Sequence, residues 1–88
     1  MSHIISLIIL FFGSTTVAYS QSSLLESVKR NPAEASALCS RFRSLNSQGI
    51  SASSKQSIQE ISLKRNLNEI DAEILSMYVR GLHCPDVD

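Results

Sequence analysis

The chain has 88 residues, with eight Lys and Arg, eight Asp and Glu, and a formal net charge of zero. This length holds one domain at most and excludes large enzyme scaffolds, such as a barrel of about 250 residues. The balanced charge excludes the strong basic bias that is typical of nucleic-acid binding proteins.

Residues 1–20 differ in composition from the rest of the chain. Every Lys, Arg, Asp and Glu lies between Glu26 and Asp88, whereas residues 4–12 form an apolar run that only one serine interrupts. A run of this length matches the apolar region of a signal peptide, at about 7–15 residues, and is short for a membrane span of about 20.

Small residues suit the positions just before a signal-peptide cleavage site, and Ala18 and Ser20 supply them if cleavage follows Ser20. Cleavage after Ala18 is an alternative. Residues 1–3 carry no Lys or Arg, which leaves two other interpretations open: an uncleaved membrane anchor, or a buried N-terminal helix of a soluble protein. We predict a signal peptide over residues 1–20 and a secreted or periplasmic domain over residues 21–88.

The predicted mature domain favours helices over strands, because it has no Thr and only two aromatic residues. Apolar spacing and capping residues predict helices over residues 22–30, 32–46, 55–65 and 68–81. The expected N-caps are Ser22 or Ser23, Asn31, Ser54 and Asn68, with Pro32 at the first position of the second helix.

The second predicted helix carries Cys39 on its apolar side, with Phe42 and Leu45 at helical spacing. We expect Arg41 and Arg43 to lie on its solvated side. A joint rich in serine follows, in which Gly49 is expected to adopt the left-handed conformation that ends a helix.

The last predicted helix carries two adjacent apolar stripes. Ile70, Ile74, Met77 and Tyr78 form one, and Leu75, Val79 and Leu82 form the other. This face is too wide for a single packing seam, so we expect the helix to be central and packed on both the 32–46 and 55–65 helices. The alternative is that part of the face binds a partner. Gly81 and Pro85 are expected to end the helix, and residues 86–88 to fray.

Cys39 and Cys84 are the only cysteines in the chain. In an oxidising compartment two cysteines allow one pairing, and closing this loop contributes about 4 kcal/mol to stability. A domain of under about 70 residues has a small core and needs such a cross-link. A reactive thiol is the alternative, but no Cys-x-x-Cys motif supports it. We predict a structural disulfide between Cys39 and Cys84.

His83 beside Cys84 does not complete a metal or haem site. Covalent haem attachment requires Cys-x-x-Cys-His, and zinc requires about four ligands. We therefore predict no catalytic residue, no cofactor and no metal, with Cys39 and His83 as the only candidates for a catalytic role.

Several short motifs, taken in chain order, resemble a family of small exported two-cysteine helical proteins of unknown function from mycobacteria and marine cyanobacteria. The motifs are Leu38-Cys39, Gly49, Asp71-Ala72-Glu73, Tyr78-Val79 and His83-Cys84-Pro85. The resemblance spans roughly Ala37 to Asp86. It implies an exported helical domain with a Cys39–Cys84 bridge and brings no known activity. The mycobacterial type has a further helical stretch before the first cysteine, for which residues 21–36 are the available place.

The sequence thus predicts an all-α domain of three helices, with a fourth short helix as an option, stapled by one disulfide. The predicted function is a non-enzymatic binding module with an unknown protein partner in the cell envelope or outside the cell. The alternatives are a membrane-anchored small protein that retains residues 1–20 and a secreted effector or inhibitor peptide. We expect no nucleic-acid partner, and a membrane partner only if the signal segment is retained.

Overall fold

The computed structural model describes residues 20–88, so the predicted signal peptide lies outside the described residues apart from Ser20. The described chain forms four α-helices and no strand. Their bounds are α1 Gln21–Arg30, α2 Pro32–Ser47, α3 Lys55–Arg65 and α4 Glu69–His83. The predicted all-α class is confirmed, with α1 as the fourth helix, and each predicted range is met to within about two residues.

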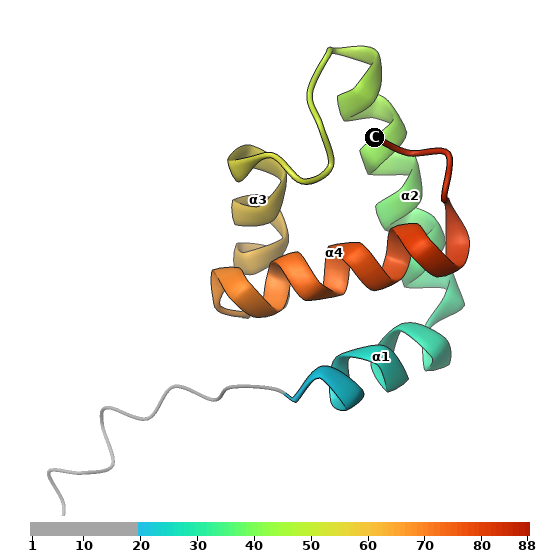
Figure 1. The fold of residues 1–88 in the computed structure, drawn as a ribbon, viewed down its shortest axis with the longest axis vertical. Helices are drawn as coiled ribbons and strands as arrows, with labels where there is room; N and C mark the ends of the chain where they lie inside the picture. Colours follow the sequence, from blue (N-terminus) through green and yellow to red (C-terminus); the bar gives the residue numbers. More distant parts are fainter. Residues whose placement is uncertain (1–19) are drawn as a thin grey trace, which may run out of the picture.

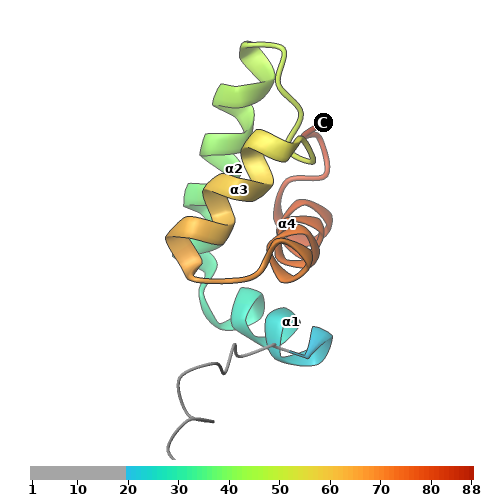
Figure 2. The same ribbon diagram turned by 90° about the vertical axis from the view of Figure 1, so that its left-hand side faces the viewer.

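The other three helices are arranged around α4. Helices α2 and α3 run side by side in opposite directions, and α4 crosses both of them (Figures 1 and 2). Helix α1 lies along α4 beside the lower end of α2. The prediction that α4 packs on both the second and the third helix is confirmed, and α4 contacts α1 as well.

Local capping signals explain most of the helix ends. Ser54 and Asn68 each accept a hydrogen bond from the main-chain N–H three residues later, as predicted. Gly49 has a φ of 78° and ends α2. There the Gly49 N–H donates to the oxygen of Asn46 and the Ile50 N–H donates to that of Leu45, each at 2.9 Å. These two hydrogen bonds satisfy main-chain oxygens in the last turn of the helix.

Two predicted caps are wrong. The cap of α1 is Ser20, whose Oγ accepts from the Ser23 N–H at 3.1 Å, because the helix begins earlier than predicted. Asn31 makes no side-chain cap on α2. Its Nδ2 instead donates to the oxygen of Ser27 at 3.2 Å and so closes the end of α1. Pro32 does occupy the start of α2, as predicted.

All four helices contribute to the core, which packs on α4, and α3 adds Ile58 and Ile61 to it. Phe42, Leu45, Leu75 and Val79 are almost wholly buried, and α1 adds Leu24 from below. At about 25 cal/mol per Å² of buried apolar area, such side chains are the main source of stability in a domain of this size.

The predicted burial of both apolar stripes of α4 is wrong in part. Ile70, Met77 and Leu82 are 71%, 56% and 52% exposed, whereas Leu75 and Val79 are buried. Within residues 20–88, α4 contacts the other three helices, and these helices bury Leu75 and Val79 but leave Ile70 and Met77 exposed.

The predicted end of α4 at Gly81 is also wrong. The helix continues through Gly81 to His83, and the Cys84 N–H still donates to the oxygen of Arg80 at 3.2 Å. Pro85, which cannot continue a helix, follows directly. Gly81 does not have a positive φ, so nothing in its backbone requires glycine.

Candidate functional site

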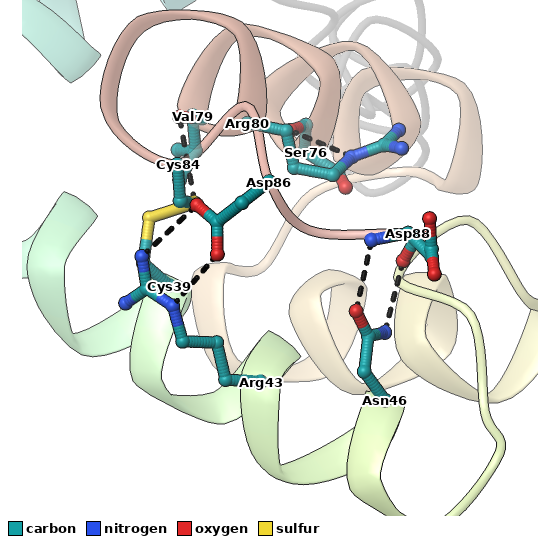
Figure 3. Close-up of a disulfide and its surroundings, with 9 residues drawn as sticks. All are labelled: Cys39, Arg43, Asn46, Ser76, Val79, Arg80, Cys84, Asp86 and Asp88. Atoms are coloured by element: carbon teal, nitrogen blue, oxygen red, sulfur yellow. Dashed lines mark hydrogen bonds and ion pairs between the residues drawn. A yellow bond between two sulfur atoms is a disulfide. The ribbon is translucent and has the colours of Figure 1, made fainter.

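The cross-link between α2 and the exit of α4 organises one end of the molecule. Cys39 and Cys84 form a disulfide with a Cα–Cα distance of 6.0 Å and a sequence separation of 45 (Figure 3). The two residues are 3% and 0% exposed, and neither of the two cysteines is free. The Cys84 Sγ lies 3.9 Å from the main-chain oxygen of Val79, a packing contact because a disulfide sulfur carries no hydrogen. The pairing predicted from the sequence is therefore present, and it is shielded from solvent.

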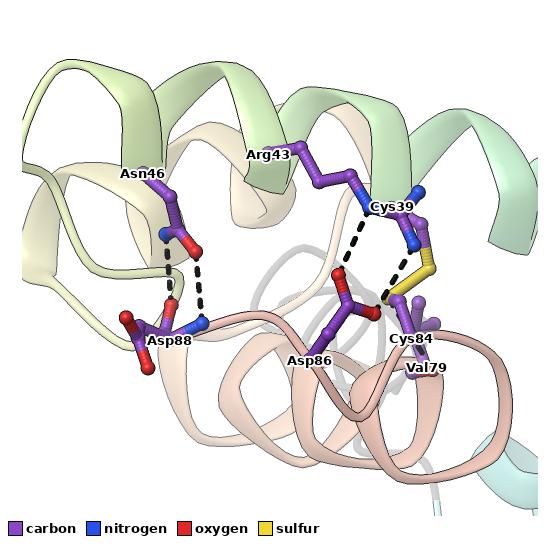
Figure 4. A network of polar contacts seen from close by, with 7 residues as sticks. All are labelled: Cys39, Arg43, Asn46, Val79, Cys84, Asp86 and Asp88. Atoms are coloured by element: carbon purple, nitrogen blue, oxygen red, sulfur yellow. Dashed lines mark hydrogen bonds and ion pairs between the residues drawn. A yellow bond between two sulfur atoms is a disulfide. The ribbon is translucent and has the colours of Figure 1, made fainter.

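The segment after the disulfide is docked on α2, so the predicted frayed tail is wrong. Val87 is buried, and the Asp86 carboxylate receives both arms of the Arg43 guanidinium at 3.2 Å (Figure 4). The hydrogen bonds from Arg43 hold the pKa of the Asp86 carboxyl below its ordinary value of 3.8. Arg43, predicted to be solvated, thus holds the tail against α2 while remaining half exposed.

A single amide, Asn46, fixes the end of the tail. Its Oδ1 accepts from the Asp88 N–H at 2.8 Å, and its Nδ2 donates to the main-chain oxygens of Asp88 and Ile50, each at 3.0 Å (Figure 4). The Ala52 N–H donates to the same Asp88 oxygen at 2.7 Å. Asn46 therefore uses both amide hydrogens and its oxygen to join the tail to the α2–α3 joint.

A second polar framework spans α2 and α3. The Arg41 Nε and Nη2 donate to the two carboxylate oxygens of Glu60, each at 2.8 Å, and Arg65 forms an ion pair with Glu34. The hydrogen bonds between Arg41 and Glu60 raise the pKa of Arg41 and hold the pKa of Glu60 below its ordinary value of 4.5. The prediction that Arg41 lies only on a solvated side is therefore wrong, because the residue links two helices.

A hollow lies between these two ion pairs, and we call it the α2–α3 groove. Leu38 is half-buried in its wall, and Ile61 is 3% exposed at its floor. Arg41, Lys64 and Arg65 form a basic rim, in which Arg41 and Arg65 are paired with Glu60 and Glu34 and Lys64 is exposed. Glu34 and Ala37 complete its lining. Helix α2 presents Leu38 and Arg41 to it at i, i+3 spacing, and α3 presents Ile61, Lys64 and Arg65 at i, i+3, i+4 spacing. An apolar surface with a basic rim suits an amphipathic segment that carries a carboxylate.

The residues singled out earlier as catalytic candidates are not brought together with reactive partners. Cys39 is held in the disulfide, and His83 is exposed at the end of α4. Within residues 20–88, no group of three or more His, Cys, Asp and Glu side chains is placed to hold a metal ion. In the same region no helix is long and apolar enough to cross a membrane.

Sequence analysis missed the residues that connect distant parts of the chain. Asn46 and Asp86 find their partners 42 and 43 residues away, so no local pattern marks them. Asn66, with a φ of 54°, ends α3 in the left-handed conformation. The sequence could have indicated this helix end, because Asn adopts the left-handed conformation more readily than any residue other than Gly, and Asn66 stands just before the cap Asn68 of the next helix.

The fold and its cross-link define a class, a small four-helix domain stapled by one buried disulfide. Residues 25–84 match the model of a domain of unknown function, DUF8664, and the chain belongs to this family. The match runs from α1 to Cys84 and so contains both cysteines. No curated protein and no solved structure matches the chain.

Proposed function

We propose that this chain is an exported, non-enzymatic binding module that acts through the surface of its cross-linked domain. The observation that carries the proposal is the buried Cys39–Cys84 bridge, because structural disulfides persist in secreted and periplasmic compartments. The apolar, uncharged run at residues 4–12 supports export independently. The resemblance to exported two-cysteine proteins of the mycobacterial and cyanobacterial type agrees with this location.

The α2–α3 groove is the surface that we assign to the partner. The half-buried Leu38 offers apolar contact, and the basic rim favours an acidic protein segment. The exposed Lys64 adds a positive charge beside the rigid Arg41–Glu60 pair. Charge complementarity of this kind directs the choice of partner and speeds association.

Export is tested by the intact mass of the native protein. Cleavage after Ser20 gives the mass of residues 21–88, and reduction adds two hydrogens at the disulfide. Recovery of the full-length mass in the membrane fraction would overturn cleaved export in favour of an anchored protein. Full-length product with free thiols in the cytoplasm would overturn the whole proposal.

The cleavage position has a structural consequence that the same mass resolves. Ser20 is the N-cap of α1, so cleavage after Ser20 removes the cap, whereas cleavage after Ala18 retains it. Loss of a serine cap costs about 1 kcal/mol. Product beginning at residue 19 would therefore contain the more stable α1.

Binding is tested by capture from the exported fraction with wild-type protein and the Lys64→Glu variant. Reversal of this exposed charge is expected to lose the partner and to leave the fold intact. Lys29→Glu, an exposed reversal on α1, is the matched control and is expected to retain the partner. Equal capture by all three proteins would show that the groove is not the binding surface.

A further inference from the structure

The outer side of α4 carries an apolar stripe that is exposed in part. Ile70, Ile74, Met77 and Gly81 follow one another at spacings of four, three and four residues, so they share one side of the helix. Ile70 and Met77 are 71% and 56% exposed, whereas Ile74 is half-buried and packs against the core. The other three helices lie to one side of α4 or below it (Figures 1 and 2), and within residues 20–88 the stripe stays exposed at Ile70, Met77 and Gly81.

Two opposite charges flank the stripe on the same side. Glu73 is exposed, and Arg80 follows it by seven residues, or two helical turns. The Arg80 Nε donates to the Ser76 main-chain oxygen at 3.3 Å, and its other guanidinium nitrogens point away from that oxygen (Figure 3). An acidic group near one end of the stripe and a basic group near the other make the surface complementary to its own reversed copy.

We propose that the outer side of α4 is a homodimer surface on which a second copy packs with its α4 antiparallel. A two-fold axis level with Ser76 and Met77 places Met77 close to its counterpart and Ile74 close to Tyr78 of the other copy, each within about 1.5 Å of the same height along the helix. The same operation puts Glu73 of each copy opposite Arg80 of the other, which forms two equivalent ion pairs.

Gly81 adds a reason for helix-to-helix contact. It is exposed, and a Cβ built on it meets nothing within 4 Å, so the packing of the monomer does not require glycine there. In the antiparallel pair Gly81 lies about 3 Å along the helix axis from the level of Ile70 of the second copy, and the missing side chain leaves room for that isoleucine. A single helix pair buries less than a standard interface of about 1,600 Å², so the dimer is expected to be weak, with a Kd in the micromolar range or above.

This inference rests on the proposed function only in that the chain acts by binding. The stripe on α4 and the α2–α3 groove share no residue, so each surface can be altered alone. If the wild-type protein dimerises but Lys64→Glu captures the partner as well as the wild type does, the groove proposal is overturned and the dimer proposal stands.

The test is sedimentation velocity on the oxidised, naturally processed protein over about 10 µM to 1 mM. Wild-type protein is expected to change from monomer to dimer within this range. Met77→Lys, Glu73→Arg and Arg80→Glu are each expected to raise the dimer Kd at least about tenfold. The double variant Glu73→Arg with Arg80→Glu restores both ion pairs and is expected to recover most of the affinity.

Two matched controls separate this surface from general effects of charge. Leu63→Lys alters an apolar residue that is 85% exposed on α3, and Glu26→Arg reverses an exposed charge on α1. Both are expected to dimerise like the wild type. Circular dichroism spectra that match the wild type show that each variant is folded.

Monomer at every concentration would overturn the proposal, as would a dimer that the three single variants leave unchanged. Failure of the double variant to recover would overturn the antiparallel arrangement. Protein that stays monomeric but floats with phosphatidylcholine vesicles, and loses this with Met77→Lys, would overturn the proposal in favour of a lipid surface.

Discussion

Removal of the Cys39–Cys84 bridge is expected to be the most damaging single change to the stability of the domain. The bond joins residues separated by 45 positions. In the chain-entropy relation, closing a loop of that length stabilises the folded state by about 4 kcal/mol at 25 °C. Domains below about 70–80 residues rarely obtain more than about 3–5 kcal/mol from their core, so the bridge supplies a comparable share.

Cys39→Ser, Cys84→Ser and the double variant should therefore each lose at least the stability that the bond contributes, since each removes the same bond. At roughly 4–8 °C per kcal/mol for a domain of this size, the thermal midpoint should fall by about 15–30 °C. Serine also places a hydroxyl in a buried position, which costs a further ~1–3 kcal/mol if the hydroxyl finds no partner. Alanine variants at the same positions lack this hydroxyl and are the control for its cost.

The assay is thermal and urea unfolding followed by far-UV circular dichroism, with and without reductant. Reduced wild-type protein should match the alanine variants. A loss under about 1 kcal/mol would refute the loop-closure reasoning. A large loss from one single variant alone would show that the effect comes from local packing and not from the bond.

Three further predictions concern the helix ends and the polar network. Gly81→Ala should stabilise the domain by about 0.5–1 kcal/mol, because Gly81 lies inside α4 and the added Cβ would meet open space. Gly49→Ala should destabilise the domain, because Gly49 has a positive φ. Urea unfolding measures both effects. The Glu60 carboxyl has a lowered pKa in the folded state, so its contribution to stability is complete above pH 4.5 and is lost as the pH falls through the folded pKa. In Glu60→Gln, the free energy of unfolding measured in urea should change less between pH 5 and pH 2 than in the wild type. Asn46→Ala should release the tail at a cost of about 1–3 kcal/mol, visible as faster amide exchange at Asp88, and unchanged exchange there would contradict the docking.

The helix pattern of this chain could be predicted because its signals are local. Ser54 and Asn68 cap helices through bonds that reach only three residues, and Gly49 ends one through its own backbone. Periodicity likewise identified Leu75 and Val79 as core residues. Each of these features depends on a stretch of sequence shorter than a helix.

The covered and uncovered sides of α4 could not be predicted in the same way. Periodicity shows that Ile70 and Met77 share a side, but whether that side is buried depends on where the other helices pack. The Arg43–Asp86 pair has the same origin, since its partners meet only after α2 and α4 are joined. Asn31 shows the converse, a residue with a good capping sequence whose side chain bonds to the preceding helix instead.

The disulfide also fixes the topology of the molecule, because it closes residues 39–84 into a covalent ring. Helices α3 and α4 lie wholly inside this ring, whereas α1 lies outside it and is joined to α2 through Asn31. A protease that cuts the joint between α2 and α3 leaves a single covalently linked molecule. After a cut at Asn31, α1 is held by noncovalent contacts alone, among them the packing of Leu24 and Val28 and the hydrogen bond from Arg65 to Ser27. The ring thus divides the described chain into a portion that one cut leaves covalently linked and one helix that a cut separates.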